Sequence, residues 1–267
     1  MTAFGPFGKY WRIAVQIFSY GVFGIGALFV ALFFFPVIHL APIHRDKKTV
    51  RVQWVIHYLF RLFLGLISLL RGMDFKWVNG QTIPCHGPFL LVANHPTLLD
   101  VVLLVSQIPQ ADCVVKGELF NNPFLFLVVK CAGYIPNSDG TAVVQEAVAR
   151  ILKGRNVIVF PEGTRSSPDR LKPFELGFAH IAVRADCVVL PVFLKCSPAA
   201  LSKGNGLFSV PSQKAQLQGQ VGTPAPASRY YTPGVSRFVA VRELANNIHR
   251  LFQENLGYDE PSHRRRT

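Results

Sequence analysis

The segment from residue 89 to residue 100 reads FLLVANHPTLLD and gives the first indication of the fold. Its apolar residues at 89–93 predict a buried strand, which the polar Asn94-His95-Pro96 brings to an end. The following segment, 97–106, has the periodicity of a helix. Polar side chains at a point where a strand gives way to a helix occupy a common position for functional groups in α/β folds.

The same alternation of strands and helices continues along the chain. Short apolar, β-branched runs predict further strands at 113–116, 157–160 and 187–194. Helical periodicity marks 123–130, 141–153 and 238–252. The segment 197–236 is rich in Gly, Pro, Ser and Gln, and predicts loops mixed with edge strands. This order of elements predicts an α/β fold with a mostly parallel sheet flanked by helices.

The first seventy residues have a different character. No Lys, Arg, Asp or Glu occurs from Ile13 to Leu40, which is longer than the roughly 20 apolar residues that a membrane span requires. A signal peptide is the competing interpretation, but its apolar region is usually shorter, about 7–15 residues, and no small-residue cleavage site is evident. The second apolar stretch, 52–70, contains His57 and Arg61, so we expect a helix at the membrane interface or one that pairs with the first. We therefore divide the chain into membrane-embedded or interfacial helices at 1–72 and an α/β domain at 73–267.

The net charge of +13 indicates that the protein binds an anionic partner, such as anionic lipid or nucleic acid. Many basic residues flank the apolar segments: Lys9, Arg12, Arg45, Lys47, Lys48, Arg51 and the terminal Arg264, Arg265 and Arg266. They are not interleaved with aromatic residues in a nucleic-acid motif, which favours anionic lipid over nucleic acid. An acidic cofactor, such as a nucleotide thioester or an acidic carrier protein, also fits this positive charge.

Cysteines and metal ligands follow no recognised pattern. Cys85, Cys113, Cys131, Cys187 and Cys196 are scattered without a C-x-x-C pair, which argues against a disulfide framework or a zinc site and is typical of a reducing compartment. No cluster of metal ligands, P-loop or G-x-S-x-G nucleophile motif is present, so a lipase or nucleotidase is a poor interpretation.

The first candidate site lies within Asn94–Asp100. Asp100 can accept a hydrogen bond from one nitrogen of the His95 imidazole and leave the other nitrogen free to remove a proton. Thr97 and Asp100 also have the spacing of a capping box, so the alternative is that Asp100 only stabilises the start of a helix. The residues by themselves leave both interpretations open.

The second candidate site is FPEGTR at 160–165, directly after a predicted strand. Gly163 permits a tight turn that exposes backbone N–H groups, Arg165 can bind a phosphate with two hydrogen bonds, and Glu162 can anchor a hydroxyl or a cation. The alternative is a strand-end turn with a surface ion pair.

The two motifs together resemble the glycerolipid acyltransferase family, in particular the 1-acylglycerol-3-phosphate acyltransferases. That family is marked by N-H-x-x-x-x-D and F-P-E-G-T-R in this order, and here His95 precedes Glu162 by 67 residues. The resemblance covers roughly residues 75–194 and implies that His95 is the general base, that Asp100 orients it, and that the acceptor hydroxyl attacks the thioester directly. Lys116 matches the start of the family's acceptor-binding block. The substrate-binding residues implied by the resemblance are Asn94, Lys116, Glu162, Gly163, Thr164 and Arg165.

One departure from the family pattern concerns the acceptor. Members that bind a phosphate acceptor carry an Arg six residues after the Gly of the second block, whereas this chain has Asp139 six residues after Gly133. A carboxylate in place of a cation weakens phosphate binding, which suggests an acceptor without phosphate, such as a glycolipid, an amino-acid lipid or a polyene head group. The alternative is that Ser138 or Asp139 caps the helix that follows.

From the resemblance we expect transfer of a fatty acyl chain from acyl-CoA or acyl carrier protein to the hydroxyl of a lysophospholipid-type acceptor, in membrane lipid biosynthesis. Neither a metal nor a bound organic cofactor is expected. The expected partners are membrane lipids and the thioester donor, and no nucleic acid. Because the donors are cytoplasmic, we expect a bacterial inner-membrane location with the catalytic domain facing the cytoplasm. The alternatives are an O- or N-acyltransferase for a lipid without phosphate, and a catalytically silent lipid-binding relative.

Overall fold

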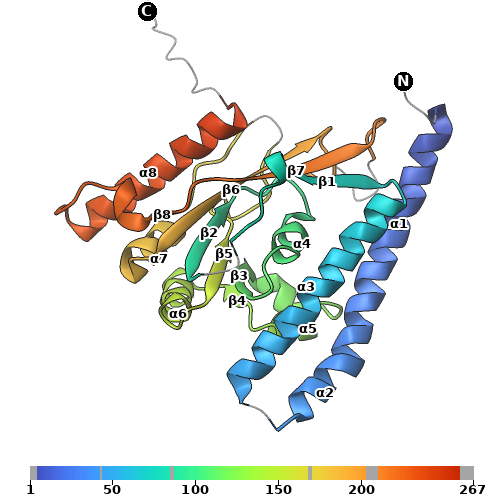
Figure 1. Ribbon diagram of the computed structural model, residues 1–267, viewed down its shortest axis with the longest axis horizontal. Helices are drawn as coiled ribbons and strands as arrows, with labels where there is room; N and C mark the ends of the chain where they lie inside the picture. Colours follow the sequence, from blue (N-terminus) through green and yellow to red (C-terminus); the bar gives the residue numbers. More distant parts are fainter. Residues whose placement is uncertain (1–4, 43, 85–86, 168–169, 203–209, 259–267) are drawn as a thin grey trace, which may run out of the picture.

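The N-terminal region is a pair of long helices. The computed structural model describes residues 5–42, 44–84, 87–167, 170–202 and 210–258. Helix α1 (Gly5–Phe29) continues through the π-helical turn η1 (Val30–Phe34) into α2 (Phe35–Leu40), and α3 (Arg45–Leu69) runs back alongside α1 (Figure 1). Residues Gly8–Ile38 and Asp46–Leu69 are long and apolar enough to cross a membrane, by length and composition.

Aromatic packing joins these two helices. The ring of Phe23 on α1 lies 6.1 Å from that of Phe60 and 5.4 Å from that of Phe63, both on α3, measured between ring centroids. The indole Nε1 of Trp11 donates a hydrogen bond of 2.9 Å to the carbonyl oxygen of Leu70. The expectation that the second apolar stretch pairs with the first is therefore confirmed.

Two polar residues of α3, Gln53 and His57, face the α/β domain. His57 is buried and its Nδ1 donates to the carbonyl oxygen of Val105 at 2.8 Å, whereas Arg61 is exposed. Val52 and Ile56 belong to the same buried cluster as residues of the sheet. The division of the chain at 72/73 stays a prediction, because the buried core continues across it.

The described strands form an eight-stranded sheet in the order β1-β7-β6-β2-β5-β3-β4, with β8 paired to β6. Neighbouring strands are parallel except for the pairs β6–β7 and β6–β8. The prediction of a mostly parallel sheet is confirmed. The strands are β1 (Met73–Trp77), β2 (Phe89–Ala93), β3 (Ala111–Lys116), β4 (Ile135–Asn137), β5 (Asn156–Val159), β6 (Val188–Ser197), β7 (Ala215–Val221) and β8 (Ala225–Pro226).

The interpretation of 197–236 as loops with edge strands needs one correction. Strand β7 lies inside the sheet, between β1 and β6, and Ala215 and Leu217 are buried. The polar residues of β7 predicted an edge strand or loop. In the structure Gln216, Gln218 and Gln220 alternate with these buried positions and stay half-buried.

Helices cover both faces of the sheet (Figure 1). Helices α4 (Asp100–Val105) and α5 (Phe126–Cys131) start three residues later than predicted, because a turn precedes each of them. The turn before α4 lies at 97–99. In the turn before α5, Asn122 Oδ1 accepts a hydrogen bond from the N–H of Phe124. The remaining helices are α6 (Gly140–Leu152), α7 (Gly177–Ala185) and α8 (Arg237–Leu256), with 3₁₀ turns η2 (Val78–Gly80), η3 (Gly117–Asn121) and η4 (Ala227–Tyr230).

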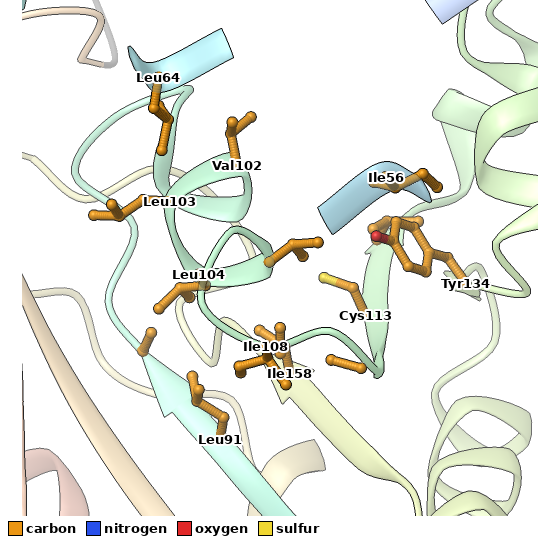
Figure 2. Packing of buried hydrophobic residues seen from close by; sticks show 14 of the residues in the cluster. Ile56, Leu64, Leu91, Val102, Leu103, Leu104, Ile108, Cys113, Tyr134 and Ile158 are labelled. Carbon is orange, nitrogen blue, oxygen red and sulfur yellow. The ribbon is translucent and has the colours of Figure 1, made fainter. Parts of the chain in front are cut away.

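Alternating side chains of the central strands build two buried clusters. Leu91 of β2 and Ile158 of β5 pack with α3 and α4, whose Ile56, Leu103 and Leu104 are shown in Figure 2. Leu90 and Val157, on the opposite face, pack with α6, α7 and α8. Because both faces are covered, the central strands are apolar throughout.

The cysteines belong to this apolar packing. Cys113 and Cys187 are buried, Cys131 and Cys196 are partly exposed, and all four are free thiols. Burial and the nearby Asp112 raise the pKa of the Cys113 thiol to about 12, which makes it unreactive at neutral pH. Cys85 and the basic residues Arg264–Arg266 lie outside the described residues.

Candidate active site

The register of two neighbouring strands brings the two motifs together. Strand β2 pairs in parallel with β5, and Val92 lies opposite Val159, 67 positions later in the chain. His95 and Glu162 are separated by the same 67 positions, so they follow the carboxyl ends of their strands at the same level. This is the edge of a parallel sheet at which α/β proteins bind ligands.

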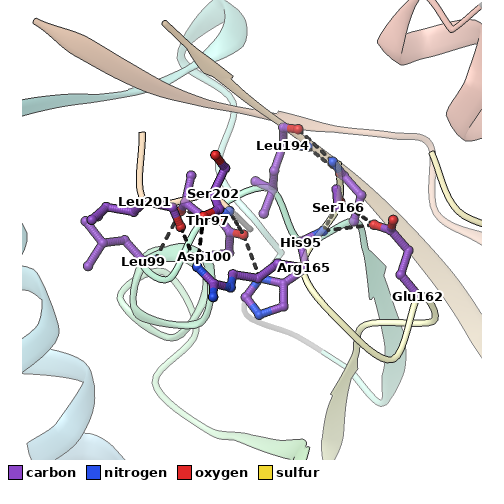
Figure 3. Close-up of polar contacts among 11 residues, drawn as sticks. His95, Thr97, Leu99, Asp100, Glu162, Arg165, Ser166, Leu194, Leu201 and Ser202 are labelled. Carbon is purple, nitrogen blue, oxygen red and sulfur yellow. Dashed lines mark hydrogen bonds and ion pairs between the residues drawn. The ribbon is translucent and has the colours of Figure 1, made fainter. Parts of the chain in front are cut away.

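His95 and Asp100 form a hydrogen-bonded pair (Figure 3). His95 Nδ1 donates to Asp100 Oδ2 at 2.7 Å, which leaves Nε2 as the proton-accepting nitrogen of a neutral imidazole. The imidazole side chain is 20% exposed and the carboxylate is fully buried. The ring also stacks on Phe160, with 4.5 Å between centroids, which restricts its orientation.

Asp100 is held by the turn that precedes α4. The backbone N–H of Thr97 donates to Oδ2 at 2.7 Å, and the hydroxyl of Thr97 donates to Oδ1 at 2.6 Å. Burial raises the pKa of the Asp100 carboxyl above its usual value, while the hydrogen bonds from His95 and Thr97 oppose that shift. One carboxylate therefore makes the contacts that both interpretations require, with the imidazole and with the turn, and the role of His95 as a base stays a prediction.

Glu162 connects the two motifs from behind the imidazole. Its buried carboxylate accepts from the N–H of His95 at 3.3 Å, from the N–H of Lys172 at 3.2 Å, and from the hydroxyl of Ser166. Ser166 adds a reciprocal pair, since its N–H donates to His95 O at 2.7 Å and its Oγ accepts from His95 N at 3.0 Å. These bonds fix the backbone of His95 against the second motif.

Asn94 fixes the same turn to the other neighbouring strand. Its amide accepts from the N–H of Leu194 and donates to the carbonyl oxygen of Leu194, both at 2.8 Å. Asn94 is buried and, like Glu162, does not line the cavity described next. The geometry therefore gives these two residues a positioning role.

Gly163 and Arg165 shape the turn after β5. Gly163 has a φ of 63°, and a Cβ at this position would collide with the carboxylate of Glu175, so the turn requires glycine. Arg165 Nη1 donates to the carbonyl oxygens of Leu201 at 2.9 Å and Ser202 at 3.2 Å.

A cavity of about 1200 Å³ opens beside His95. Its apolar walls come from α1, α3 and α5 on one side and from α6 and α7 on the other, for example Phe23, Phe63, Val129, Val143 and Ile181. The lining includes His95, Gly163, Thr164 and the cations Arg12, Lys116 and Arg165, and among the described residues one carboxylate, Glu175. A long apolar space with a cationic region suits an amphiphilic, anionic ligand.

Asp139 does not face this cavity. It is exposed and is the N-cap of α6, where its Oδ1 accepts from the N–H of Thr141 at 3.0 Å. The capping alternative is therefore confirmed. Within the described part of the chain no group of three His, Cys, Asp or Glu side chains could hold a metal ion.

Known proteins are similar to the part of the chain that holds this site. Residues 74–195 match the family model described as Acyltransferase. This region belongs to the acyltransferase family. The chain is 30% identical over 154 residues to a 1-acyl-sn-glycerol-3-phosphate acyltransferase of Cocos nucifera, covering 53% of this chain and 50% of the relative. It is 29% identical over 170 residues to the enzyme of that name from Saccharomyces cerevisiae, covering 59% and 54%. The chain spans about half the length of the curated relatives it matches.

The fold also matches a solved structure. The crystal structure of the 1-acyl-sn-glycerophosphate (LPA) acyltransferase from Thermotoga maritima superimposes with a TM-score of 0.73 and covers 93% of this chain and 97% of that chain, at 19% identity. This similarity extends beyond the acyltransferase region to the N-terminal helices. It shows that the arrangement of helices and sheet is shared.

Sequence reasoning missed three contributors to the site of the acyltransferase region. Ser166 directly follows the second motif, and that adjacency was the available signal. Arg12 and Tyr20, which line the cavity, belong to a helix assigned only to the membrane. Nothing in their spacing to His95 indicates that α1 reaches the site.

Proposed function

We propose that this protein transfers a fatty acyl chain from a thioester donor, acyl-CoA or acyl carrier protein, to the hydroxyl of a 1-acylglycerol-3-phosphate-type acceptor. The observation that carries this proposal is the 2.7 Å hydrogen bond between His95 and Asp100 at the wall of an apolar, cation-bearing cavity. The names of the curated relatives support the acceptor class.

The chemistry requires one base. His95 Nε2 takes the proton of the acceptor hydroxyl as its oxygen attacks the carbonyl carbon of the thioester, and Asp100 stabilises the imidazolium that forms. The C–S bond breaks when the tetrahedral intermediate collapses, and the thiolate takes the proton back from His95. The products are an ester and a free thiol, so no acyl-enzyme is needed. Arg165 and Lys116 hold anionic groups of the substrates.

Membrane contact is part of the same proposal. Ile25, Phe29 and Phe33 of the N-terminal helices are exposed by 69%, 52% and 60%, which would place large apolar side chains in lipid. The acceptor would then reach the cavity from the membrane, along α1. The cytoplasmic orientation in a bacterial inner membrane follows only from the donors and stays a prediction.

The test is thiol release from acyl-CoA by the purified protein with lysophosphatidic acid as acceptor. The wild type should release thiol in proportion to acceptor acylated, and His95→Ala should lose at least about 100-fold in rate because the general base is absent. His44→Ala is the matched control, because this exposed histidine is paired only with Asp46 at 3.9 Å. If His95→Ala binds lipid and releases thiol like the wild type, the base is elsewhere. If wild type binds lipid without thiol release, the protein is a silent lipid-binding relative.

The acceptor without phosphate remains the second candidate because of Asp139. Its carboxylate is occupied at the α6 N-cap, and three cations line the cavity, which favours the phosphate acceptor. Running the same assay with monoacylglycerol beside lysophosphatidic acid decides between them.

A further inference from the structure

Helix α1 carries a polar stripe in an otherwise apolar surrounding. Arg12, Gln16, Ser19 and Tyr20 are spaced so that they share one face of the helix, and all four line the cavity. Ile17 and Phe18, on other faces, are exposed by 51% and 52%. A helix that turns its polar side chains inward and its apolar side chains outward has an arrangement suited to lipid, in which an inward cation marks a functional site.

Arg12 keeps hydrogen-bonding capacity that the protein does not use. Its Nη2 donates to the carbonyl oxygens of Pro211 at 3.3 Å and Ser212 at 2.5 Å. Its Nε is buried and has no acceptor among the described residues. An unmatched buried donor is costly, and an anion in the cavity would satisfy it.

Arg12 and Arg165 belong to the same wall of the cavity. Arg165 holds the carbonyl oxygens of Leu201 and Ser202, and Arg12 holds those of Pro211 and Ser212, further along the same connection between β6 and β7. Tyr20, two turns after Arg12 on the stripe, lines the cavity together with Arg165. Two guanidinium groups and Lys116 line one cavity, against one carboxylate in the described part of its lining, and this excess of cations favours an anionic group.

We propose that Arg12 is a specificity-determining residue that binds a phosphate group of a substrate together with Arg165. The inference rests on the acyl transfer proposed above. The phosphate belongs either to the lipid acceptor or to the thioester donor, and both present the same chemistry to a guanidinium.

The experiment compares Arg12→Gln and Arg12→Lys with Lys9→Gln, which removes an exposed cation from the same helix outside the cavity. The KM for lysophosphatidic acid, for monoacylglycerol and for acyl-CoA is measured for each. Arg12→Gln should raise the KM for lysophosphatidic acid about tenfold or more and leave that for monoacylglycerol unchanged. Arg12→Lys should recover part of the loss, and Lys9→Gln should behave like the wild type. A rise only in the KM for acyl-CoA assigns the phosphate to the donor.

A purely structural role for Arg12 gives a different result. Arg12→Gln would then lower turnover equally with every acceptor and donor, with no selective change in KM, and this outcome overturns the inference. A binding measurement tests the phosphate site at Arg12 independently of the proposed acyl transfer. Lysophosphatidic acid in detergent should raise the melting temperature of the wild type and of Lys9→Gln. The same addition should raise the melting temperature of Arg12→Gln by a smaller amount. If the wild type shows this pattern without turnover, the proposed function fails and the phosphate site stands. If wild type and Arg12→Gln are stabilised alike and show the same KM values, the phosphate site fails.

Discussion

At the residue scale, one carboxylate carries two tasks. Asp100 accepts from His95 Nδ1 and from both the N–H and the hydroxyl of Thr97, so the side chain that orients the base also holds the turn before α4. Its burial makes ionisation costly, since the pKa of the carboxyl is raised relative to an unfolded chain. The unfolding free energy therefore falls as the pH rises from the unfolded pKa through the folded one. An ionised Asp100 beside His95 therefore lowers the unfolding free energy of the protein.

Replacing Asp100 by Asn should separate the two tasks. An Asn side chain can accept from His95 Nδ1 and the Thr97 N–H through its oxygen and donate to the Thr97 hydroxyl through its amide, so the turn is retained. We expect the melting temperature of Asp100→Asn at pH 7 to equal or exceed that of the wild type. Thiol release should fall by roughly 1000-fold or more, because the imidazolium loses its counter-charge. An active Asp100→Asn variant, or one that fails to fold, would contradict this account.

At the scale of elements, a buried polar network attaches α3 to the sheet. Asp112 of β3 accepts from Arg155 Nε at 2.6 Å and Nη2 at 2.7 Å, and from Gln53 Nε2 of α3 at 2.9 Å. Gln53 in turn accepts from Arg155 Nη2 at 3.0 Å and donates to Ala132 O at 2.8 Å. The hydrogen bonds to Asp112 raise the pKa of Arg155, so the cation stays charged. The helix that walls the cavity is thus fixed by side chains as well as by apolar contact.

Removing the centre of this network should loosen α3. In Asp112→Ala a largely buried guanidinium and a buried amide lose their acceptor, and we expect the unfolding free energy to fall by about 3–5 kcal/mol. Chemical denaturation in detergent measures this unfolding free energy. Glu146→Ala is the control, because it breaks the exposed i,i+4 pair of Glu146 with Arg150, which is worth about 0.3–0.5 kcal/mol. Equal effects of the two substitutions would show that the network does not anchor α3.

At the scale of the whole molecule, the cavity lies between the sheet edge and the N-terminal helices. Its walls include residues of α1 and α3 as well as those of the α/β domain, so the two parts of the chain form one site. Large apolar side chains of α1 and η1, among them Ile25, Phe29 and Phe33, remain exposed. In the proposed acyl transfer, a lipid acceptor would move from the bilayer to His95 along these walls without crossing water.

Membrane binding should depend on those exposed residues. Replacing Phe29, Phe33 and Phe34 together by Ser should lower the fraction of protein that floats with phospholipid vesicles, since each Phe contributes about 1.5–3 kcal/mol when buried in lipid. Their exposure, 52%, 60% and 53%, means that the melting temperature should change little. Phe238→Ser, at a position 63% exposed on α8, is the control. Undiminished flotation of the triple variant would place the membrane contact elsewhere on the molecule.

The sequence by itself determined the class of fold and indicated residues of the candidate site. Local apolar runs such as 89–93 and 157–159 predict buried strands wherever they occur, and the functional side chains of an α/β protein follow such strands. His95, Asp100, Gly163 and Arg165 could therefore be named from residues close to them in the chain.

Only the tertiary structure decided how distant residues meet. The pairing of β2 with β5 places Glu162 and Ser166 behind His95, and makes Glu162 and Asn94 supports of the turn. The position of β7 inside the sheet and the approach of Arg12 to the cavity follow from packing between segments far apart in sequence. Local periodicity carries no information about such contacts, because they depend on which faces are buried against each other.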